Sequence, residues 1–340
     1  MQKRSIVEEM LNLNLNAIRS RTQQLKDVIV KTPVIKLHSP YLHKYLLAKN
    51  IFLKLECFQH TGTFKARGAM SVSSSISHEN QKHGITAASA GNHAIAAAWA
   101  ARKLGTSAKV IMRSTANPYR ISRVKEENAE IKIVDDVKEL FEEAEKLVKE
   151  EKRTFIHPFE GINTTLGTAG VGIEFIEEVP NLDLVIVSVG GGGLISGVAS
   201  SIKFINSNCK VIGVEPIGAN SMFSSFKKGK PIQNANTNTL VDSLAPPMTL
   251  PFSFNVCKKF VDKIVLVSDD EICASMVILQ EEAKLAIEPA AAACLAAILG
   301  PLKEMVHGKN VGLVMCGANI DNQSYSKLLK TGRNYKKSNQ

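Results

Sequence analysis

The arrangement of hydrophobic and polar positions becomes regular near Gly84. From there, runs of four or five apolar residues alternate with longer segments whose apolar residues recur with the helical period. Strands are predicted at 85–88, 108–112 and 131–134, helices at 91–104, 118–128 and 137–151, and the segment 154–157 closes the block. Short strands that alternate with helices indicate a parallel sheet with crossover helices, so we expect a small α/β unit here.

A second alternating block follows, and a less regular segment precedes both blocks. Its strands are predicted at 184–189, 211–214, 263–267 and 311–315, its helices at 166–178, 193–206, 219–227, 269–285, 289–299 and 323–329, with a loop-rich segment at 234–254 and a frayed tail at 335–340. The opening segment predicts helices at 14–30, 37–47 and 64–76 and a strand at 51–55. A chain of 340 residues exceeds what one core usually covers, so we expect two domains of the α/β class.

The charge of the chain narrows the range of partners. Its net charge is +10, but the basic residues are dispersed, with short clusters only at Lys227-Lys228 and Lys336-Lys337. No basic stripe with interleaved aromatic residues is present, so we expect no nucleic-acid partner. A basic surface does favour anionic small molecules, which suits a small-molecule substrate.

The cysteines and the N-terminal segment bear on the compartment. The six cysteines show no CxxC pair and no histidine at metal-ligand spacing, which is typical of a reducing compartment. Residues 1–10 are charged and lack the apolar core of a signal peptide. The most apolar helical run, 286–299, is too short to span a membrane. We therefore expect a cytoplasmic protein without a membrane partner.

Lys65 occupies an unusual position for a lysine. The turn Thr61-Gly62-Thr63 separates the strand at 51–55 from the helix at 64–76, so Lys65 falls in the first helical turn. The positive end of the helix dipole disfavours a cation there and favours the neutral amine. A neutral amine is the nucleophile that Schiff-base chemistry requires. An ordinary solvated lysine is the alternative that this context alone leaves open.

Four consecutive glycines, Gly190, Gly191, Gly192 and Gly193, lie between the strand at 184–189 and the helix at 193–206. Such a loop is costly in backbone entropy, but it lets several N–H groups point one way at a helix N-terminus, as in a phosphate cradle. The spacing matches neither GxGxxG nor GxxxxGK[ST], so it suits a phosphomonoester better than a dinucleotide or ATP. A tight turn without a ligand is the alternative.

Three further segments carry candidate chemistry. Ser89, Ala90, Gly91, Asn92 and His93 lie between a strand and a helix N-terminus, which suits a carboxylate or a ring hydroxyl. Cys316 follows the last strand, where side chains of an open α/β sheet face the ligand crevice. Glu288 and Pro289 start an Ala-rich helix. A plain N-cap, a buried thiol and a helix start are the respective alternatives.

In combination and in this order, these motifs resemble the fold-type II pyridoxal-phosphate enzymes, specifically the group of threonine/serine dehydratases (ammonia-lyases) and serine racemases. The segments that carry the resemblance are 56–69, 89–93, 157–159, 190–196, 213–216, 288–289 and 316–319. The resemblance covers about residues 15–329. It implies two open, mainly parallel twisted sheets flanked by helices, as in the tryptophan synthase β-subunit. It also implies a large cofactor-binding domain (1–80 and 158–340) and a small mobile α/β domain (81–157).

The resemblance also implies the role of each residue. Lys65 forms the Schiff base with pyridoxal 5'-phosphate and is the catalytic general base. The expected cofactor-binding residues are Phe64, Lys65, Asn92, Gly190, Gly191, Gly192, Gly193, Leu194, Glu288 and Cys316. The substrate carboxylate is expected on Ser89, Ala90, Gly91, Asn92 and His93. The implied reaction is β-elimination on threonine or serine, which gives a 2-oxo acid and ammonia, and a homodimer or homotetramer is expected.

Ala90 separates the two activities of the group. Serine racemases place a hydroxyl at this position, on the face of the cofactor opposite the lysine. Racemisation requires a proton donor on that face, and an alanine offers none. A dehydratase is therefore favoured over a racemase, and a non-catalytic cofactor-binding protein is the third hypothesis.

Two departures from the pattern of the group affect the metal site and the substrate. Glu215 and Ala219 match a divalent-cation site, but Ser221 stands where an acid is expected, so Mg²⁺ or Ca²⁺ is only an option. The substrate loop is Val241-Asp242-Ser243 where relatives carry Ala-Asp-Gly. Another β-hydroxy amino acid, such as a hydroxyaspartate or a hydroxylated diamino acid, is therefore an alternative substrate.

Overall fold

The computed structural model describes residues 6–233, 237–246 and 248–338. Its larger sheet has six strands in the order β1-β2-β10-β7-β8-β9. Only β1 runs antiparallel to its neighbour; the other pairs in this sheet are parallel. The strands are β1 (Val34–Lys36), β2 (Asn50–Lys54), β7 (Leu184–Ser188), β8 (Lys210–Pro216), β9 (Lys263–Val267) and β10 (Asn310–Val314).

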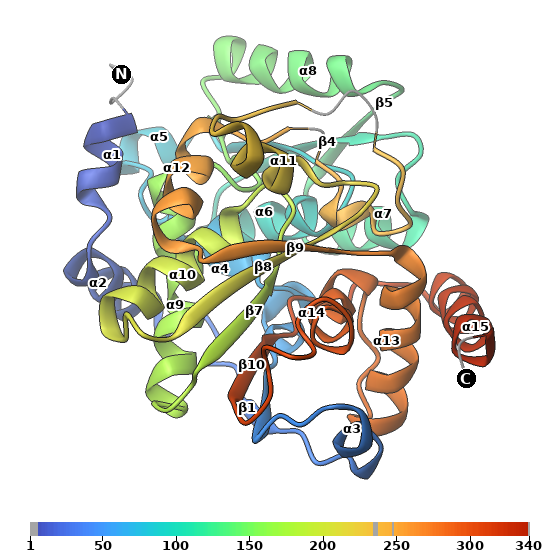
Figure 1. Ribbon diagram of the computed structural model, residues 1–340. Helices are drawn as coiled ribbons and strands as arrows, with labels where there is room; N and C mark the ends of the chain where they lie inside the picture. Colours follow the sequence, from blue (N-terminus) through green and yellow to red (C-terminus); the bar gives the residue numbers. More distant parts are fainter. Residues whose placement is uncertain (1–5, 234–236, 247, 339–340) are drawn as a thin grey trace.

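The smaller sheet has four parallel strands in the order β5-β4-β3-β6. They are β3 (Ile85–Ala88), β4 (Ala108–Arg113), β5 (Glu130–Val134) and β6 (Thr154–Phe155). The chain enters this sheet once and leaves it once, between β2 and β7. The helices that connect its strands are α6 (Asn92–Lys103), α7 (Pro118–Glu126) and α8 (Val137–Glu150). The charged helix α8 lies at the top of Figure 1.

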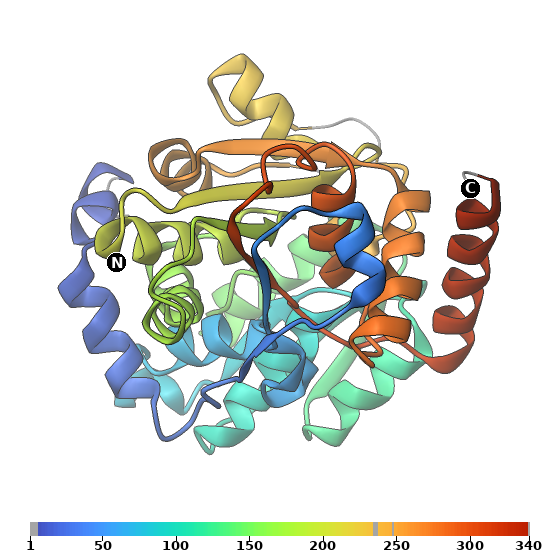
Figure 2. The same ribbon diagram turned by 60° about the horizontal axis from the view of Figure 1, so that its bottom comes forward.

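The remaining helices cover the larger sheet on both faces. Figure 1 shows α9 and α10 on one side of strands β7 and β8, and α13 and α14 on the other. Figure 2 shows the first helices and α15 at opposite sides of the molecule. The α-helices outside the smaller sheet are α1 (Ile6–Asn12), α2 (Leu15–Leu25), α3 (Pro40–Tyr45), α4 (Lys65–Ser73), α5 (His78–Gln81), α9 (Ile162–Glu178), α10 (Gly193–Ile205), α11 (Ser221–Lys228), α12 (Pro251–Phe260), α13 (Asp269–Glu282), α14 (Pro289–Leu299) and α15 (Asn322–Ser338); three short 3₁₀ helices are η1 (Glu56–Phe58), η2 (His60–Gly62) and η3 (Asp242–Leu244).

The core follows from strands that are covered on both faces. Every residue of β7 is buried, as expected for a central parallel strand between two helical layers. On one face α9 and α10 approach closely because glycines meet at their contact. A Cβ on Gly172 would lie 2.2 Å from Ser201 Oγ, and one on Gly197 would lie 2.3 Å from Thr168 Oγ1. This packing fixes the start of α10, and with it the glycine loop.

The predicted α/β class with two mainly parallel sheets is confirmed, but several boundaries differ. Strand β1 was not predicted because only three residues pair after Thr32-Pro33. Helix α12 begins inside the segment predicted as loop, at a proline in its first turn. The tail predicted as frayed is helical to Ser338, because Gly332 packs closely against the backbone of Cys273. Residues 339–340 lie outside the described part.

Candidate active site

A cavity of about 670 Å³ lies between the two sheets. Residues that follow β2, β3, β7 and β10 line it, because the carboxyl ends of parallel strands open toward the same crevice. Every residue predicted to bind cofactor or substrate lies in its wall. They are Phe64, Lys65, Ser89, Ala90, Gly91, Asn92, His93, Gly190, Gly191, Gly192, Gly193, Leu194, Glu288 and Cys316. The structure thus brings five separate segments of the sequence to one site.

Lys65 is the first residue of α4, and its side chain is half-buried. Its Nζ atom donates a hydrogen bond of 2.5 Å to the carbonyl oxygen of Pro158 and lies 5.1 Å from the centre of the Phe64 ring. Burial lowers the pKa of Lys65 to about 8, although Cys316 and Glu288 act in the opposite direction. A substantial fraction of this amine is therefore neutral near physiological pH, as a nucleophile or general base requires.

The glycine loop packs against Phe159. A Cβ on Gly191 would lie 2.3 Å from the Phe159 ring, and one on Gly193 would lie 2.8 Å from the Phe159 Cα atom. Gly192 has a φ of +96° and is the N-cap residue of α10. At this N-cap, no side chain accepts a hydrogen bond from the first N–H groups of the helix. The backbone N–H groups at the start of α10 therefore face the cavity without a side-chain acceptor, which fits a phosphate group.

Asn92, the first residue of α6, connects the smaller sheet to two elements of the larger one. Its Nδ2 atom donates to both carboxylate oxygens of Glu288, each at 2.9 Å. Its Oδ1 atom accepts from Asn319 Nδ2 at 2.8 Å. Burial raises the pKa of the Glu288 carboxyl to about 7, against the opposing effects of Arg120 and the Asn92 amide. Glu288 therefore keeps its proton to a higher pH than an ordinary glutamate.

Cys316 follows closely after the end of β10, and its side chain is buried. Its carbonyl oxygen accepts from Phe64 N at 3.0 Å and from Thr63 Oγ1 at 3.2 Å, which ties the Lys65 segment to the end of β10. Burial raises the pKa of the Cys316 thiol well above its usual value, and the nearby Glu288 carboxyl adds to the effect. The group at this position is a neutral thiol.

Two histidines near Lys65 are held in the neutral form. His93 Nε2 lies 2.8 Å from the carbonyl oxygen of Ile156, and His157 Nδ1 accepts from the N–H groups of Phe159 and Glu160 at 3.2 and 2.9 Å. Burial, together with the charge of Lys65, lowers the pKa of each to about 3. Since His157 Nδ1 accepts two hydrogen bonds, its proton resides on Nε2.

A buried ionic network that was not predicted from the sequence lies beneath α4. Arg67 donates to both carboxylate oxygens of Glu56 (2.8 and 2.9 Å) and of Glu174 (2.7 and 2.8 Å). Lys54 Nζ donates to Glu174 Oε2 at 2.6 Å and to the carbonyl oxygen of Thr32 at 2.7 Å. Two cations thus balance two anions, and the network holds α4, which carries Lys65, against β2 and α9.

The expected metal site lies apart from the cavity. Glu215 is fully buried at the end of β8, and its carboxylate accepts from the N–H groups of Met222 and Phe223 at 3.0 and 2.7 Å. This carboxylate therefore caps α11. In the described part of the chain, no group of three or more His, Cys, Asp or Glu residues could hold a metal ion. A cation at Glu215 and Ala219 stays a prediction.

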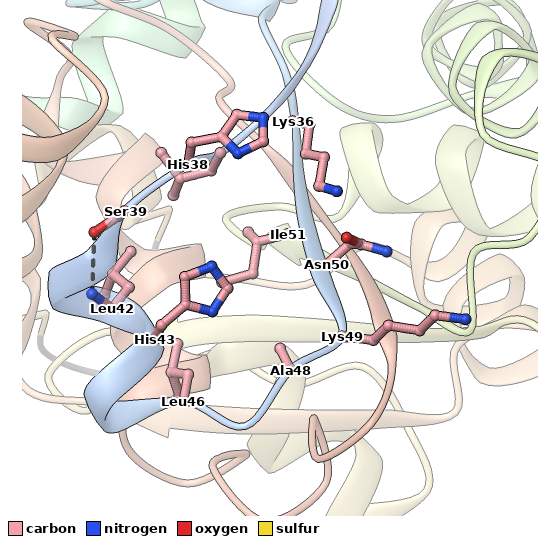
Figure 3. Close-up of a pocket in the computed structure, with 11 residues that line it drawn as sticks. Lys36, His38, Ser39, Leu42, His43, Leu46, Ala48, Lys49, Asn50 and Ile51 are labelled. Carbon is pink, nitrogen blue, oxygen red and sulfur yellow. Dashed lines mark hydrogen bonds between the residues drawn. The ribbon is translucent and has the colours of Figure 1, made fainter.

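A second cavity, of about 150 Å³, lies beside α3 and β2. Its polar lining includes Lys36, His38, His43 and Lys49 (Figure 3). Ser39 in the same wall donates to Glu282 Oε2 at 2.6 Å and accepts from Leu42 N at 3.0 Å. None of the predicted site residues lines this cavity.

All six cysteines are free thiols. Over the residues that the structure covers, none of the helices combines the length and the apolar character needed to cross a bilayer.

Known proteins of similar sequence and structure exist for this chain. Residues 25–317 match the family model described as pyridoxal-phosphate dependent enzyme. Phenylserine dehydratase of Ralstonia pickettii is 40% identical over 319 residues, which cover 94% of this chain and 97% of that protein. L-threonine ammonia-lyase of Thermotoga maritima is 35% identical, with 94% and 79% covered. The solved structure of maize serine racemase superimposes with a TM-score of 0.88 at 29% identity, and covers 95% of this chain and 99% of that one.

Proposed function

This chain belongs to the pyridoxal-phosphate-dependent enzymes, and we propose that it dehydrates threonine or serine to a 2-oxo acid and ammonia. The predicted family, cofactor and dehydratase activity on hydroxy amino acids are confirmed by the family match and by relatives that are dehydratases. The observation that carries the proposal is Lys65, a half-buried amine with a pKa lowered to about 8, in a cavity that also contains the glycine loop.

The residues present fit the cofactor. Lys65 offers the amine for its aldehyde carbon, and Gly190 to Gly193 with Leu194 offer N–H groups for its phosphate. Asn92 and Glu288 would face the ring hydroxyl, and the thiol of Cys316 would face the ring nitrogen. When bound, pyridoxal phosphate withdraws electrons from the substrate nitrogen and so acidifies the Cα–H bond.

The chain's own residues then account for removal of the Cα proton. The amine of Lys65 removes the proton from the substrate Cα in its neutral form, and its lowered pKa makes this form more abundant than in an ordinary lysine. A neutral thiol at Cys316 does not hold a proton on a ring nitrogen as a carboxylate would, which favours prompt loss of the β-hydroxyl. Ala90 offers no proton donor from its wall of the cavity, so the product is the 2-oxo acid and not the mirror-image amino acid.

A bulkier substrate is a second candidate, and one observation favours it. Leu140 and Phe141 of α8 line the cavity, and Phe141 is 39% exposed although it is a large apolar side chain on a charged helix. Apolar side chains at the mouth of a cleft suit an apolar β-substituent. The relative from Ralstonia pickettii is a phenylserine dehydratase, so phenylserine is the aryl substrate to test.

A panel of β-hydroxy amino acids tests the proposal. The purified holoenzyme is incubated with the L-forms of threonine, serine, phenylserine, hydroxyaspartate and a hydroxylated diamino acid, and 2-oxo acid and ammonia are measured together with D-amino acid. Equal amounts of 2-oxo acid and ammonia support the dehydratase. Comparable D-product from L-serine would support a racemase instead, and no product from any substrate would refute both.

We also propose a context for the enzyme. Residues 81–157 form a small mobile domain, and 1–80 with 158–340 form the large cofactor-binding domain. The single entry and single exit of the chain at the smaller sheet support this division. The enzyme acts in the cytoplasm as a homodimer or homotetramer, and six free thiols are in keeping with a reducing compartment. Sedimentation of the holoenzyme measures its oligomeric state.

A further inference from the structure

Arg120 is a buried cation in the wall of the active-site cavity, and no motif in the sequence indicated a role for it. It lies in α7, it is only 9% exposed, and it lines the cavity. Its Nη1 atom is 3.3 Å from the position that a Cβ on Gly91 would occupy. Gly91 is the N-cap of α6, the helix end expected to receive the substrate carboxylate. The guanidinium and the start of α6 therefore border the same space.

Arg120 holds a carboxylate that comes from the opposite side of the cavity. Nη1 donates to Asp242 Oδ2 at 2.5 Å, and Nη2 donates to Asp242 Oδ1 at 3.2 Å, so the pair is bidentate. Asp242 belongs to η3, between β8 and α12 in the larger-sheet part of the chain, whereas Arg120 belongs to the smaller-sheet part. A planar fork that binds one carboxylate in this way fits another of the same shape.

The two partners differ in burial, and this difference decides which of them is exchangeable. The side chain of Asp242 is 64% exposed, whereas that of Arg120 is 10% exposed. Asp242 can turn into solvent because most of its side chain is already exposed. Arg120 cannot, since a buried guanidinium without an anion is strongly unfavourable. Arg120 therefore requires a carboxylate, and that carboxylate need not be Asp242.

We propose that Arg120 is a substrate-binding residue and that the α-carboxylate of the substrate replaces Asp242 against its guanidinium. The exchange of one monoanion for another leaves the charge around Arg120 unchanged. The substrate carboxylate then lies between the guanidinium and the N–H groups at the start of α6, both of which favour an anion. This inference rests on the proposed function only in requiring an amino-acid substrate.

A purely structural latch between the two sheets is the competing explanation, and the two make opposite predictions for Asp242. If the pair is a latch, loss of either partner weakens the site equally. If Asp242 only occupies the place of the substrate carboxylate, its removal helps the substrate, whereas loss of Arg120 harms it. The two explanations also differ in how the enzyme responds to the substrate. A latch does not distinguish a substrate carboxylate from a carboxamide, whereas a binding residue does.

The test compares Arg120→Gln, Arg120→Lys and Asp242→Asn holoenzymes on L-threonine and L-threonine amide. Arg123→Gln is the matched control, since Arg123 lies in the same helix, on its exposed side, and pairs with Glu126. We expect Arg120→Gln to raise KM for threonine about ten- to a hundredfold, the range for a charged hydrogen bond. We expect kcat of Arg120→Gln to change less than its KM, and its activity on threonine amide to fall little. The KM of Arg120→Lys for threonine should lie between those of the wild type and Arg120→Gln. Asp242→Asn should have a lower KM for threonine than the wild type.

Calorimetric binding of L-alanine and L-alaninamide gives a second readout that does not depend on turnover. Equal losses on acid and amide in Arg120→Gln, or a rise in KM in Asp242→Asn like that in Arg120→Gln, would overturn the inference. Should Arg120→Gln fail to fold, Arg120→Lys and Asp242→Asn decide the question. An inactive wild-type enzyme would refute the proposed function, whereas an active one with an unaffected Arg120→Gln variant would refute this inference alone.

Discussion

The Nζ atom of Lys65 donates a hydrogen bond of 2.5 Å to the carbonyl oxygen of Pro158. Lys65 starts α4, directly after the segment joined to β2, whereas Pro158 follows β6 of the smaller sheet. This contact places the amine at the boundary between the two parts of the chain, with Phe64 on one side and the glycine loop within the same cavity. The amine is therefore held at the site, beside the point where the chain leaves the smaller sheet.

Replacement of Lys65 by alanine tests the role of this amine. We expect Lys65→Ala to lower kcat/KM by about a thousandfold, within the range for loss of a general base. The variant should also fail to retain cofactor after borohydride treatment, because no amine remains to be fixed. Activity and covalently bound cofactor are measured side by side, with Lys82→Ala, an exposed lysine, as the control. Full elimination activity in Lys65→Ala would contradict the mechanism.

The pH dependence of cofactor capture reports the state of the same amine. Only the neutral amine attacks the aldehyde, and burial lowers the pKa of Lys65 to about 8. In the apoenzyme, the rate of cofactor incorporation should therefore rise as the pH increases toward about 8 and level off above it. Each pH unit below this value should slow the reaction about tenfold. A rate that keeps rising to the pKa of an ordinary lysine would show that the amine is not buried.

A hydroxyl at position 90 should change the products. Ala90 lines the cavity and offers no proton donor. We expect Ala90→Ser to form D-serine from L-serine at a rate above that of the wild type, because a hydroxyl at position 90 itself can then donate the proton. D-serine is measured against pyruvate. Ala90→Val, which adds bulk without a hydroxyl, is the control, and equal D-serine from both variants would refute the explanation.

Two neighbouring glycines should respond differently to a methyl group. A Cβ on Gly191 would lie 2.3 Å from the Phe159 ring, whereas one on Gly190 would have its nearest neighbour at 3.3 Å. We expect Gly191→Ala to lower stability by about 1–3 kcal/mol and to weaken cofactor binding, since overpacking displaces the loop. Gly190→Ala should have a smaller effect. Cofactor titration and thermal unfolding measure both, and equal effects would mean that contact with Phe159 does not shape the loop.

The buried network should be sensitive to the loss of one charge. Glu174→Gln leaves Arg67 and Lys54 with one carboxylate, Glu56, between them. We expect a loss of about 3–5 kcal/mol in the free energy of unfolding, typical of a buried ion pair that loses one partner. Urea unfolding measures it, with Glu177→Gln, an exposed residue of the same helix, as the control. Similar stabilities of the two variants would show that the network contributes little.

Much of the fold could be predicted because most of its strands and helices have a recognisable pattern within one continuous run of sequence. The buried strand predicted at 184–189 corresponds to β7 (Leu184–Ser188), and the Ala-rich helix predicted at 91–104 corresponds to α6. Strand β1 could not be predicted, since its three residues form a strand only through pairing with β2. The last two turns of α15 depend on contact between Gly332 and Cys273, which local periodicity does not contain.

Some residues of the site could likewise be predicted from local motifs, and others could not. Lys65 and the glycine loop were recognisable because each lies within one continuous motif at a helix start. Arg120 and Asp242 are 122 positions apart, and each resembles an ordinary solvated charge until the two sheets meet. The same holds for Arg67 and Glu174, 107 positions apart. Burial and pairing of distant charges follow from the tertiary structure, so local patterns did not indicate them.

The pairing of β2 with β10 has a consequence for synthesis of the chain on the ribosome. These strands pair along their whole length, from Asn50–Asn310 to Lys54–Val314, so the segment that carries Lys65 completes its packing only after residue 314 has been synthesised. The contact between Phe64 N and the Cys316 carbonyl forms only after that strand has emerged. The packing around the reactive lysine is therefore complete only after β10 has been synthesised, so a nascent chain without this strand lacks the finished cofactor site.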